Sequence, residues 1–480
     1  MKFLGRDQEL EILHRLTTQP LGVATITGRR RVGKSRLATE FARREGRKLI
    51  KIEGRDNPQG GNAAQLAAFA ADLSRDTGTP KFNLGTWNDA FNALGTLIQD
   101  KQWIVLLDEI TWLARHSAEC LPELKVFIDH YLNGSGNCLL VCGSISHWIE
   151  QYIHDSDLFV GRISSRIVLQ PLPLADCARF WVARDVSARE ILTALCVTGG
   201  IPRYLEEIDP RESAEWNIRR LCFEPKGYLV EELPDLIKSS FLNVTRESSV
   251  ERYLDILASL SGEGKSPTEI SKDTGIIHNE HLGEQLAALR LSGIVAENPS
   301  WSLKTANFQK RGLPYRVKDP YTRFYVKYIR PHVREIDEGS YRQIVLQQLP
   351  GWETIRGLQF ESLVTQNMVP SILNRLNLQG VLIERLGPYF QRQTVRQAAV
   401  QIDYLIQTGN TLYVCETKFR KSIGIAVADE VQEKIKRLAA PRGMTIRKVL
   451  IYSGEREQAL RDSIYFDRQI CVDELLELGP

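Results

Sequence analysis

The chain has 480 residues and a net charge of +3, with 43% hydrophobic and 25% charged residues. This composition is typical of a globular chain of about two to four domains, and the small net charge excludes a uniformly basic nucleic-acid-binding protein. Its eight cysteines are scattered without a Cys-x-x-Cys pair, which argues against a zinc site or a disulfide framework. No apolar run approaches the roughly 18 residues of a membrane span, and we expect a cytoplasmic protein.

A short apolar run, residues 22–27, leads into a glycine-rich segment, and a helical pattern that begins with Arg36 follows it. The segment has the spacing Gly, four residues, Gly-Lys-Ser/Thr, which indicates phosphate binding when it lies between a strand and a helix. A chance glycine-rich turn is the alternative. We expect ATP to contact Arg36 and the loop itself, which reads Gly28-Arg29-Arg30-Arg31-Val32-Gly33-Lys34-Ser35.

The residues at the fixed positions of this spacing each have a chemical role. Gly28 and Gly33 let the backbone curl so that its N–H groups point at the phosphates, and the helix N-terminus adds partial positive charge. Lys34 is expected to reach the β- and γ-phosphates, and the Ser35 hydroxyl to bind Mg²⁺.

Two acids end the next apolar run, residues 103–107. Such a run is typical of a buried parallel strand, which delivers the residues at its end to the carboxyl edge of a sheet. There we expect Asp108 to hold the Mg²⁺ shell and Glu109 to orient or deprotonate the attacking water. Acids are also common at helix starts, which is the alternative explanation. With the glycine-rich loop upstream, we favour a site that hydrolyses ATP.

A later polar segment contributes Arg162. An arginine there is a candidate catalytic group that stabilises developing phosphate charge, either in cis or from a neighbouring subunit. A structural or exposed arginine is the alternative.

The first 240 residues resemble the archaeal and bacterial AAA-like P-loop ATPases, which are relatives of STAND-type signalling and origin-recognition ATPases. The motifs FLGRDQEL, GRRRVGKS, IVLLDE, LLVCGS, the pair Gly161-Arg162 and TGGIPRYL follow one another in the same order as in that family. Family members often self-associate, so a homo-oligomer is one expectation.

The resemblance also implies roles for residues outside the loop. The segment with Gly5 and Arg6 would wrap the adenine, and Pro202 would lie against it. Ser144, at the end of LLVCGS, would sense the γ-phosphate. Alternatively, Ser144 is the N-cap of a helix at residues 145–149, and Pro202 is an ordinary proline at the first turn of a helix.

Residues 250–317 have the pattern of a winged helix-turn-helix domain, with wing strands expected at 301–304 and 315–317. The third helix carries Glu280 and Glu284, which would repel DNA phosphates, so we favour an intramolecular or protein–protein role. A spacer domain is equally compatible with the pattern. DNA binding by the wing stays open, through Lys304, Lys310 and Arg311.

Two strand-like runs, residues 400–406 and 412–418, flank a Gly-Asn pair that is a two-residue hairpin signal. If that turn closes the hairpin, Asp403 lies opposite Glu416, and Lys418 shares their face. Two carboxylates and an ammonium suit Mg²⁺-assisted phosphodiester hydrolysis. A three-residue turn would put the two acids on opposite faces, and a surface charge ladder is a further alternative.

With Glu361 on a preceding helix, this pattern resembles the PD-(D/E)xK restriction-endonuclease-like superfamily over about residues 340–475. The resemblance implies that Glu361, Asp403 and Glu416 hold Mg²⁺ and that Lys418 positions or activates the water. The residue before Asp403 is Ile402 instead of the usual proline. The order of ATPase, winged helix and nuclease-like fold also occurs in one subfamily of these ATPases.

We therefore predict an α/β multidomain chain: a P-loop AAA-like ATPase domain (1–175), a helical lid (176–245), a winged helix domain (246–335) and a PD-(D/E)xK nuclease-like α/β domain (340–480). One function that fits is a Mg²⁺-dependent ATPase that acts on DNA and cuts it. The other is a STAND-like switch, controlled by nucleotide, whose C-terminal domain is a non-catalytic binding or dimerisation module.

Overall fold

The computed structural model describes residues 3–56, 60–99, 102–181, 185–241, 244, 246–297, 303, 314–391, 393–395 and 397–476. The chain forms two compact units, the first mainly residues 1–170 and the second mainly residues 171–480. Among the described residues, no helix has the length and apolar character needed to span a membrane.

A five-stranded parallel sheet with the order β2-β3-β4-β1-β5 forms the centre of the first unit. Every residue of β1, β3 and β4 is buried, as expected for strands covered on both faces. The parallel sheet predicted from the apolar runs is therefore confirmed. The strands are β1 (Gly22–Gly28), β2 (Lys48–Glu53), β3 (Trp103–Asp108), β4 (Cys138–Gly143) and β5 (Ser165–Leu169).

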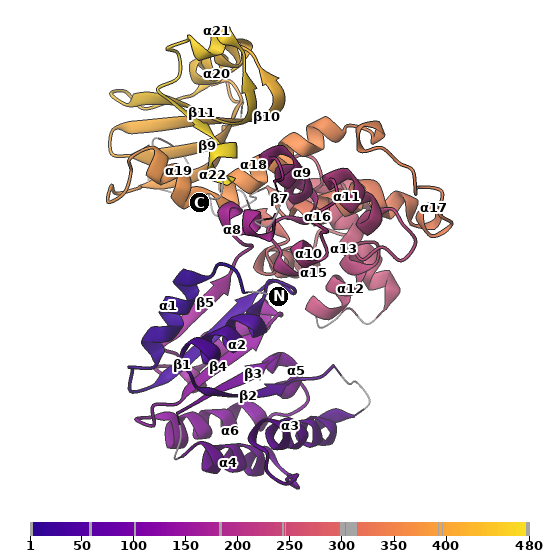
Figure 1. Cartoon of the computed structure of the whole chain (residues 1–480), viewed down its shortest axis with the longest axis vertical. Coiled ribbons are helices and arrows are strands. Elements are labelled where there is room, and N and C mark those ends of the chain that lie inside the picture. The colour runs from indigo at the N-terminus through magenta and orange to yellow at the C-terminus, as the bar shows by residue number, and fades with distance from the viewer. Residues whose placement is uncertain are drawn as a thin grey trace. The chain divides into compact units, whose positions relative to one another are not determined.

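Helices cover both faces of this sheet (Figure 1). Helices α1 and α2 pack on one face, against side chains such as Ile26 and Leu106. Helices α3, α4 and α6 pack on the other face, against Val105 and Val141, which alternate along the strands with the first set. The helices are α1 (Asp7–Leu16), α2 (Lys34–Arg44), α3 (Gly61–Thr77), α4 (Trp87–Ile98), α5 (Ile110–Ala114), α6 (Cys120–Phe127) and α7 (Ser146–Ile149).

The second unit begins with a helical region. Its helices are α8 (Leu174–Ala178), α9 (Ala188–Thr198), α10 (Pro202–Glu206), α11 (Ala214–Cys222), α12 (Glu232–Ser240), α13 (Glu247–Ser259), α14 (Pro267–Thr274) and α15 (Glu280–Leu291). The last three lie where the winged helix-turn-helix pattern predicts helices. Ser266 caps α14 reciprocally with Glu269, which explains why the helix begins at that point.

The strand predicted at residues 315–317 is present as β7 (Tyr315–Val317) and pairs antiparallel with β6 (Val295–Glu297). Of the other predicted wing strand, residues 301–304, the structure describes Leu303 alone. The basic residues proposed for DNA binding, Lys304, Lys310 and Arg311, lie outside the described residues.

The chain continues through α16 (Pro320–Phe324), α17 (Val333–Asp337), α18 (Trp352–Asn367) and α19 (Val369–Arg375) into a mixed five-stranded sheet. The sheet order is β12-β11-β10-β9-β8, with β8, β9 and β10 antiparallel and β10, β11 and β12 parallel. Helices α20 and α18 both pack on β10 (Figure 1). The remaining elements are β8 (Arg385–Gln391), β9 (Val400–Thr408), β10 (Thr411–Ile423), α20 (Ala426–Arg437), β11 (Thr445–Arg456), α21 (Gln458–Arg461), β12 (Arg468–Cys471) and α22 (Asp473–Leu476).

Candidate functional site

The glycine-rich loop joins the carboxyl end of β1 to α2. Gly28 and Gly33 have φ angles of 136° and 100°, which side chains disfavour. A β-carbon on Gly28 would also lie 2.6 Å from the carbonyl oxygen of Leu169. Helix α2 begins at Lys34, so the loop ends on a helix N-terminus, where anions bind favourably.

The side chain of Lys34 is buried inside this loop. Its Nζ donates hydrogen bonds to the carbonyl oxygens of Gly28, at 3.0 Å, and Arg29, at 3.3 Å. The ammonium thus lies within the ring of loop backbone in which a phosphate-binding lysine is needed.

The segment that contains Gly5 and Arg6 contacts the loop directly. Both residues have left-handed φ angles, 69° and 68°, just before α1 begins. The buried Arg6 guanidinium donates to the Val32 carbonyl oxygen at 3.1 Å and pairs with Glu9 at 3.2 Å. Arg6 therefore stabilises the loop through its hydrogen bond to Val32. Its position in the sequence does not indicate this structural role.

Ser35 and Asp108 meet at the carboxyl edge of the sheet. The Ser35 hydroxyl donates to Asp108 Oδ2 at 2.6 Å, although the two residues are 73 positions apart. A hydroxyl and a carboxylate are hard oxygen donors of the kind that Mg²⁺ prefers, so the residues present fit that ion.

Sequence reasoning missed Lys51, on the neighbouring strand β2. Its Nζ lies 3.0 Å from Asp108 Oδ2 and 3.2 Å from Glu53. Burial lowers the pKa of Lys51, but the two carboxylates outweigh burial and leave that pKa raised. The sequence feature that could have indicated a role for Lys51 is its place inside the otherwise apolar run Leu-Ile-Lys-Ile.

Glu109 and Ser144 are joined at the ends of adjacent strands. Glu109 Oε2 accepts hydrogen bonds from the Ser144 backbone N–H at 3.0 Å and from its hydroxyl at 2.9 Å. Helix α7 begins at Ser146 with Ile145 at its N-cap, so the interpretation of Ser144 as the helix cap is wrong. The Ser144 hydroxyl donates its hydrogen bond to Glu109 and so fixes the position of that carboxylate.

The remaining residues predicted to act on the nucleotide lie in several places. Arg162 pairs through two nitrogens with the carboxylate of Asp129, at 2.7 and 2.9 Å. Pro202 belongs to the second unit, where it is at the first turn of α10. Three residues of the loop region complete the set: Arg30, which is half-buried, Arg31, with a left-handed φ of 73°, and Arg36, which is exposed.

The hairpin between β9 and β10 has the predicted register. From Thr411–Thr408 to Cys415–Tyr404, the numbers of each pair add to 819, as a two-residue turn requires. Asp403 and Glu416 are the next residues on the two strands. Asp403 Oδ2 accepts from the Thr417 N–H and hydroxyl, each at 2.9 Å, so the acid is fixed against the partner strand.

Two lysines neutralise these acids. Lys418 Nζ lies 2.9 Å from Glu416 Oε1 and 2.7 Å from Glu430. Lys434, on α20, was not predicted as a site residue, and its Nζ lies 2.6 Å from Glu416 and 3.3 Å from Asp403. The packing of α20 on β9 and β10 brings it to the acids.

Glu361, the third predicted acid, lies on α18 and is buried. Burial and the nearby Asp403 raise the pKa of Glu361, against the opposing influence of Arg316 and Arg323. Burial and Asp403 likewise raise the pKa of Glu416, although the two lysines oppose them. Within the described part of the chain, no three His, Cys, Asp or Glu side chains are grouped to hold a metal ion. The three acids are therefore neighbours held by cations, and their joint binding of Mg²⁺ stays a prediction.

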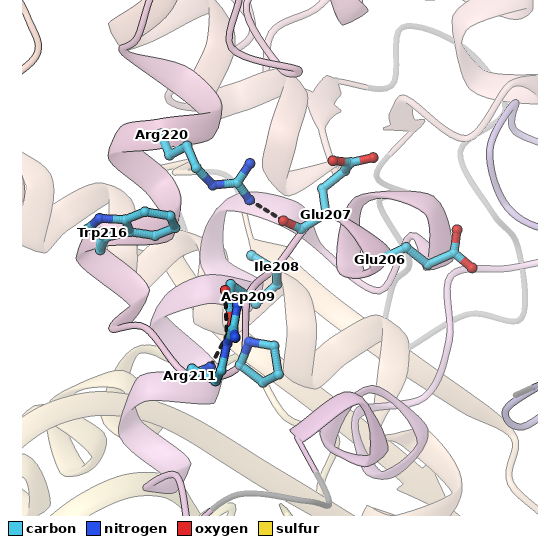
Figure 2. A pocket seen from close by; sticks show the side chains of 8 residues that line it. Glu206, Glu207, Ile208, Asp209, Arg211, Trp216 and Arg220 are labelled. Atoms are coloured by element: carbon cyan, nitrogen blue, oxygen red, sulfur yellow. Dashed lines mark hydrogen bonds and ion pairs between the residues drawn. The ribbon is translucent and has the colours of Figure 1, made fainter. Parts of the chain in front are cut away.

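A separate pocket of about 660 Å³ lies between α10 and α11 (Figure 2). Its charged groups already have partners: Arg211 pairs with Asp209, and Arg220 donates to the carbonyl oxygen of Glu207. No predicted site residue lines it. The lining residues are Glu206, Glu207, Ile208, Asp209, Pro210, Arg211, Trp216 and Arg220.

Comparisons with known proteins find relatives in sequence and in structure. No family model matches the chain. An uncharacterized protein of Methanocaldococcus jannaschii is 23% identical over 395 residues, which are 81% of this chain and 82% of that protein. The Walker-type ATPase PABY2304 of Pyrococcus abyssi matches in structure with a TM-score of 0.50 and 20% identity, over 68% of this chain and 96% of that one. The ORC2 protein of Aeropyrum pernix, in its ADPNP-ADP complexes, gives a TM-score of 0.42 and 16% identity, over 71% and 95%. The match to PABY2304 shows that this chain shares the fold of that Walker-type ATPase over 68% of its length.

Proposed function

We propose that the first unit binds ATP with Mg²⁺ and hydrolyses it. The observation that carries this proposal is the hydrogen bond between the Ser35 hydroxyl and Asp108, next to a Glu109 carboxylate that Ser144 holds. A lysine and a serine at the end of such a loop, together with two acids at the end of a neighbouring strand, are the groups that catalyse phosphoryl transfer to water.

Each residue has a separate task in this proposal. Lys34 and the loop N–H groups bind the β- and γ-phosphates, and Glu109 orients the attacking water and takes its proton. Ser35 and Asp108 would hold Mg²⁺, which when bound neutralises phosphate charge. Ser144, through its hydrogen bonds, positions Glu109. Arg162 would need to leave Asp129 to act on the γ-phosphate, in cis or in a homo-oligomer.

The same proposal assigns the domains: AAA-like ATPase at 1–175, helical lid at 176–245 and winged helix at 246–335. The exposed face of α15 carries Glu280 and Glu284, which favours a protein-facing role for that helix over phosphate contact. DNA would then be bound elsewhere, by the wing or by the C-terminal domain.

Nucleotide binding tests the first proposal. We expect the full chain to bind Mg²⁺-ATP in calorimetry and Lys34→Ala to weaken that binding at least about tenfold, because a charged hydrogen bond contributes on the order of 1.5–3 kcal/mol. Arg15→Ala is the control, since Arg15 is an exposed cation of the same unit. Equal affinity in the Lys34 and Arg15 variants would contradict the proposal.

As a second function, we propose that residues 340–480 form a nuclease-like domain that cuts DNA with Mg²⁺. The observation that favours it is the hairpin register, which sets Asp403 and Glu416 on one face with Lys418. Buried acids clustered with two lysines are the kind of charged group that is common at functional sites, which supports this proposal. Asp403, Glu416 and Glu361 would hold the metal, and Lys418 would position or activate the water.

Cleavage assays test this second proposal. With Mg²⁺ or Mn²⁺, we expect the full chain to cut single- or double-stranded DNA, and Glu416→Ala and Lys418→Ala each to lower the rate at least about tenfold. Glu433→Ala, an exposed acid on α20, is the control. Cleavage that survives both substitutions would contradict the site. If no cleavage occurs while nucleotide binding persists, the STAND-like switch with a non-catalytic C-terminal module is the better function.

A further inference from the structure

Lys51 lies on the same face of the parallel sheet as Asp108. Side chains alternate between the two faces of a strand, and Leu49, two positions before Lys51, belongs to the core under α1 and α2. Leu106, two positions before Asp108 on β3, belongs to the same core. Lys51 and Asp108 therefore both lie on the face that α2 covers, which is the helix that follows the glycine-rich loop.

The backbone of Lys51 is held at a fixed place beside β3. Its N–H donates to Asp76 Oδ2 at 2.7 Å, and its carbonyl oxygen accepts from Arg75 at 3.1 Å. In the register of the two strands, Lys51 lies opposite Leu106, two residues before Asp108. The long lysine side chain spans this offset, and its ammonium reaches the Asp108 carboxylate at the edge of the sheet.

Lys51 and Ser35 meet on one oxygen atom of Asp108. The Lys51 ammonium lies 3.0 Å from Asp108 Oδ2, which is also the oxygen that accepts the Ser35 hydroxyl at 2.6 Å. This hydroxyl and this carboxylate are the groups proposed to hold Mg²⁺. The ammonium therefore places a positive charge beside the oxygen donors that the ion would use.

The second partner of Lys51 gives its ammonium an alternative position. Glu53, two residues further along β2, lies 3.2 Å from Lys51 Nζ, and its side chain is 53% exposed. The Asp108 side chain is only 5% exposed. An ammonium displaced from Asp108 would thus keep a carboxylate partner nearer to solvent, where losing or gaining an ion pair changes stability little.

We propose that Lys51 is a built-in counter-cation of the nucleotide site, which neutralises Asp108 when no metal is bound and lets the chain hold nucleotide without magnesium. This inference rests on the proposed ATP binding. Without a cation, the Asp108 carboxylate would repel the phosphate groups that the loop binds, and the ammonium 3.0 Å away offsets that repulsion. The same ammonium competes with Mg²⁺ for Asp108, so it reduces the gain in nucleotide affinity that the metal brings.

Binding of a non-hydrolysable ATP analogue to the full chain, measured by calorimetry in excess EDTA and in excess Mg²⁺, tests this role. The deciding quantity is the ratio of the dissociation constant in EDTA to that in Mg²⁺. We expect Lys51→Met to raise this ratio at least about fivefold, mainly through weaker binding in EDTA, because the charge of Asp108 is then unopposed until metal binds. Lys48→Met is the matched control: it makes the same change at an exposed position at the other end of β2, and it should leave the ratio unchanged.

Two further variants separate charge from other contributions of the side chain. Lys51→Arg keeps a cation and should keep the ratio of the unmodified chain. Lys51→Gln loses the charge but can still donate a hydrogen bond to Asp108, so it should fold even where Lys51→Met does not and should also raise the ratio.

The outcomes distinguish this inference from the function on which it rests. If Lys51 only joined β2 to β3, its replacement would change both dissociation constants by the same factor. An unchanged ratio in Lys51→Gln would therefore overturn the counter-cation role alone, as would binding by the unmodified chain in Mg²⁺ only. Absence of nucleotide binding by the unmodified chain under both conditions would overturn the proposed ATP binding and this inference with it.

Discussion

Replacement of Glu109 by glutamine is expected to lower the rate of ATP hydrolysis by about 10²–10⁴-fold while leaving nucleotide binding nearly unchanged. The amide keeps the size of the carboxylate, and its oxygen can still accept the hydrogen bond from the Ser144 hydroxyl. It cannot take a proton from the attacking water. Phosphate release under saturating Mg²⁺-ATP measures the first effect, and calorimetry with Mg²⁺-ATP measures the second.

The matched control is Glu119→Gln, which makes the same chemical change at an exposed position of the same unit. It should hydrolyse ATP at the unmodified rate. A loss of ATP binding in Glu109→Gln as large as that in Lys34→Ala would contradict the assigned role, because it would mean that Glu109 acts on binding instead of on the chemical step.

Local patterns were sufficient to predict where the glycine-rich loop and the acidic end of β3 lie. The loop between Gly28 and Ser35 needs left-handed glycines at fixed spacing, and β3 needs an apolar run that ends in acids. Each of these requirements involves about ten neighbouring residues or fewer, so it can be recognised from the sequence alone. The hairpin register was predictable for the same reason: the two-residue turn at Gly409 and Asn410 fixes which residues of β9 and β10 lie opposite each other.

Contacts between distant elements were not predictable from those patterns. Lys51 and Lys434 reach the acids only because β2 pairs with β3 and α20 packs on the second sheet. Ser144 was predicted at the right strand end, but its partner Glu109 depends on which strands are neighbours. The Arg316–Glu361 pair spans 45 residues and two predicted domains, and neither residue carries a local signal for the other.

Replacement of Lys434 by methionine is expected to destabilise the C-terminal domain by about 3 kcal/mol at pH 8, because Asp403 loses its lysine partner and Glu416 keeps only Lys418, so buried negative charge is left partly uncompensated. Lys434 now opposes the raised pKa of Glu416. Without it, the folded-state pKa of Glu416 rises further above the 4.5 of the unfolded chain, so the folded state binds a proton that the unfolded chain has released. Stability must then fall as pH rises above 4.5, and the loss at pH 5 should be smaller, roughly 1 kcal/mol. Denaturant unfolding at the two pH values measures the difference.

Lys436→Met separates this effect from the loss of any lysine on α20. Lys436 pairs with Glu433, and both side chains are more than half exposed, so its removal should change stability by less than about 1 kcal/mol at either pH. If Lys434→Met lost the same stability at pH 5 as at pH 8, the missing contribution would be packing of the lysine stem instead of charge. Glu416 and Asp403 would then lie together in the sheet without needing the charge of Lys434, with Lys418 as the remaining cation on Glu416.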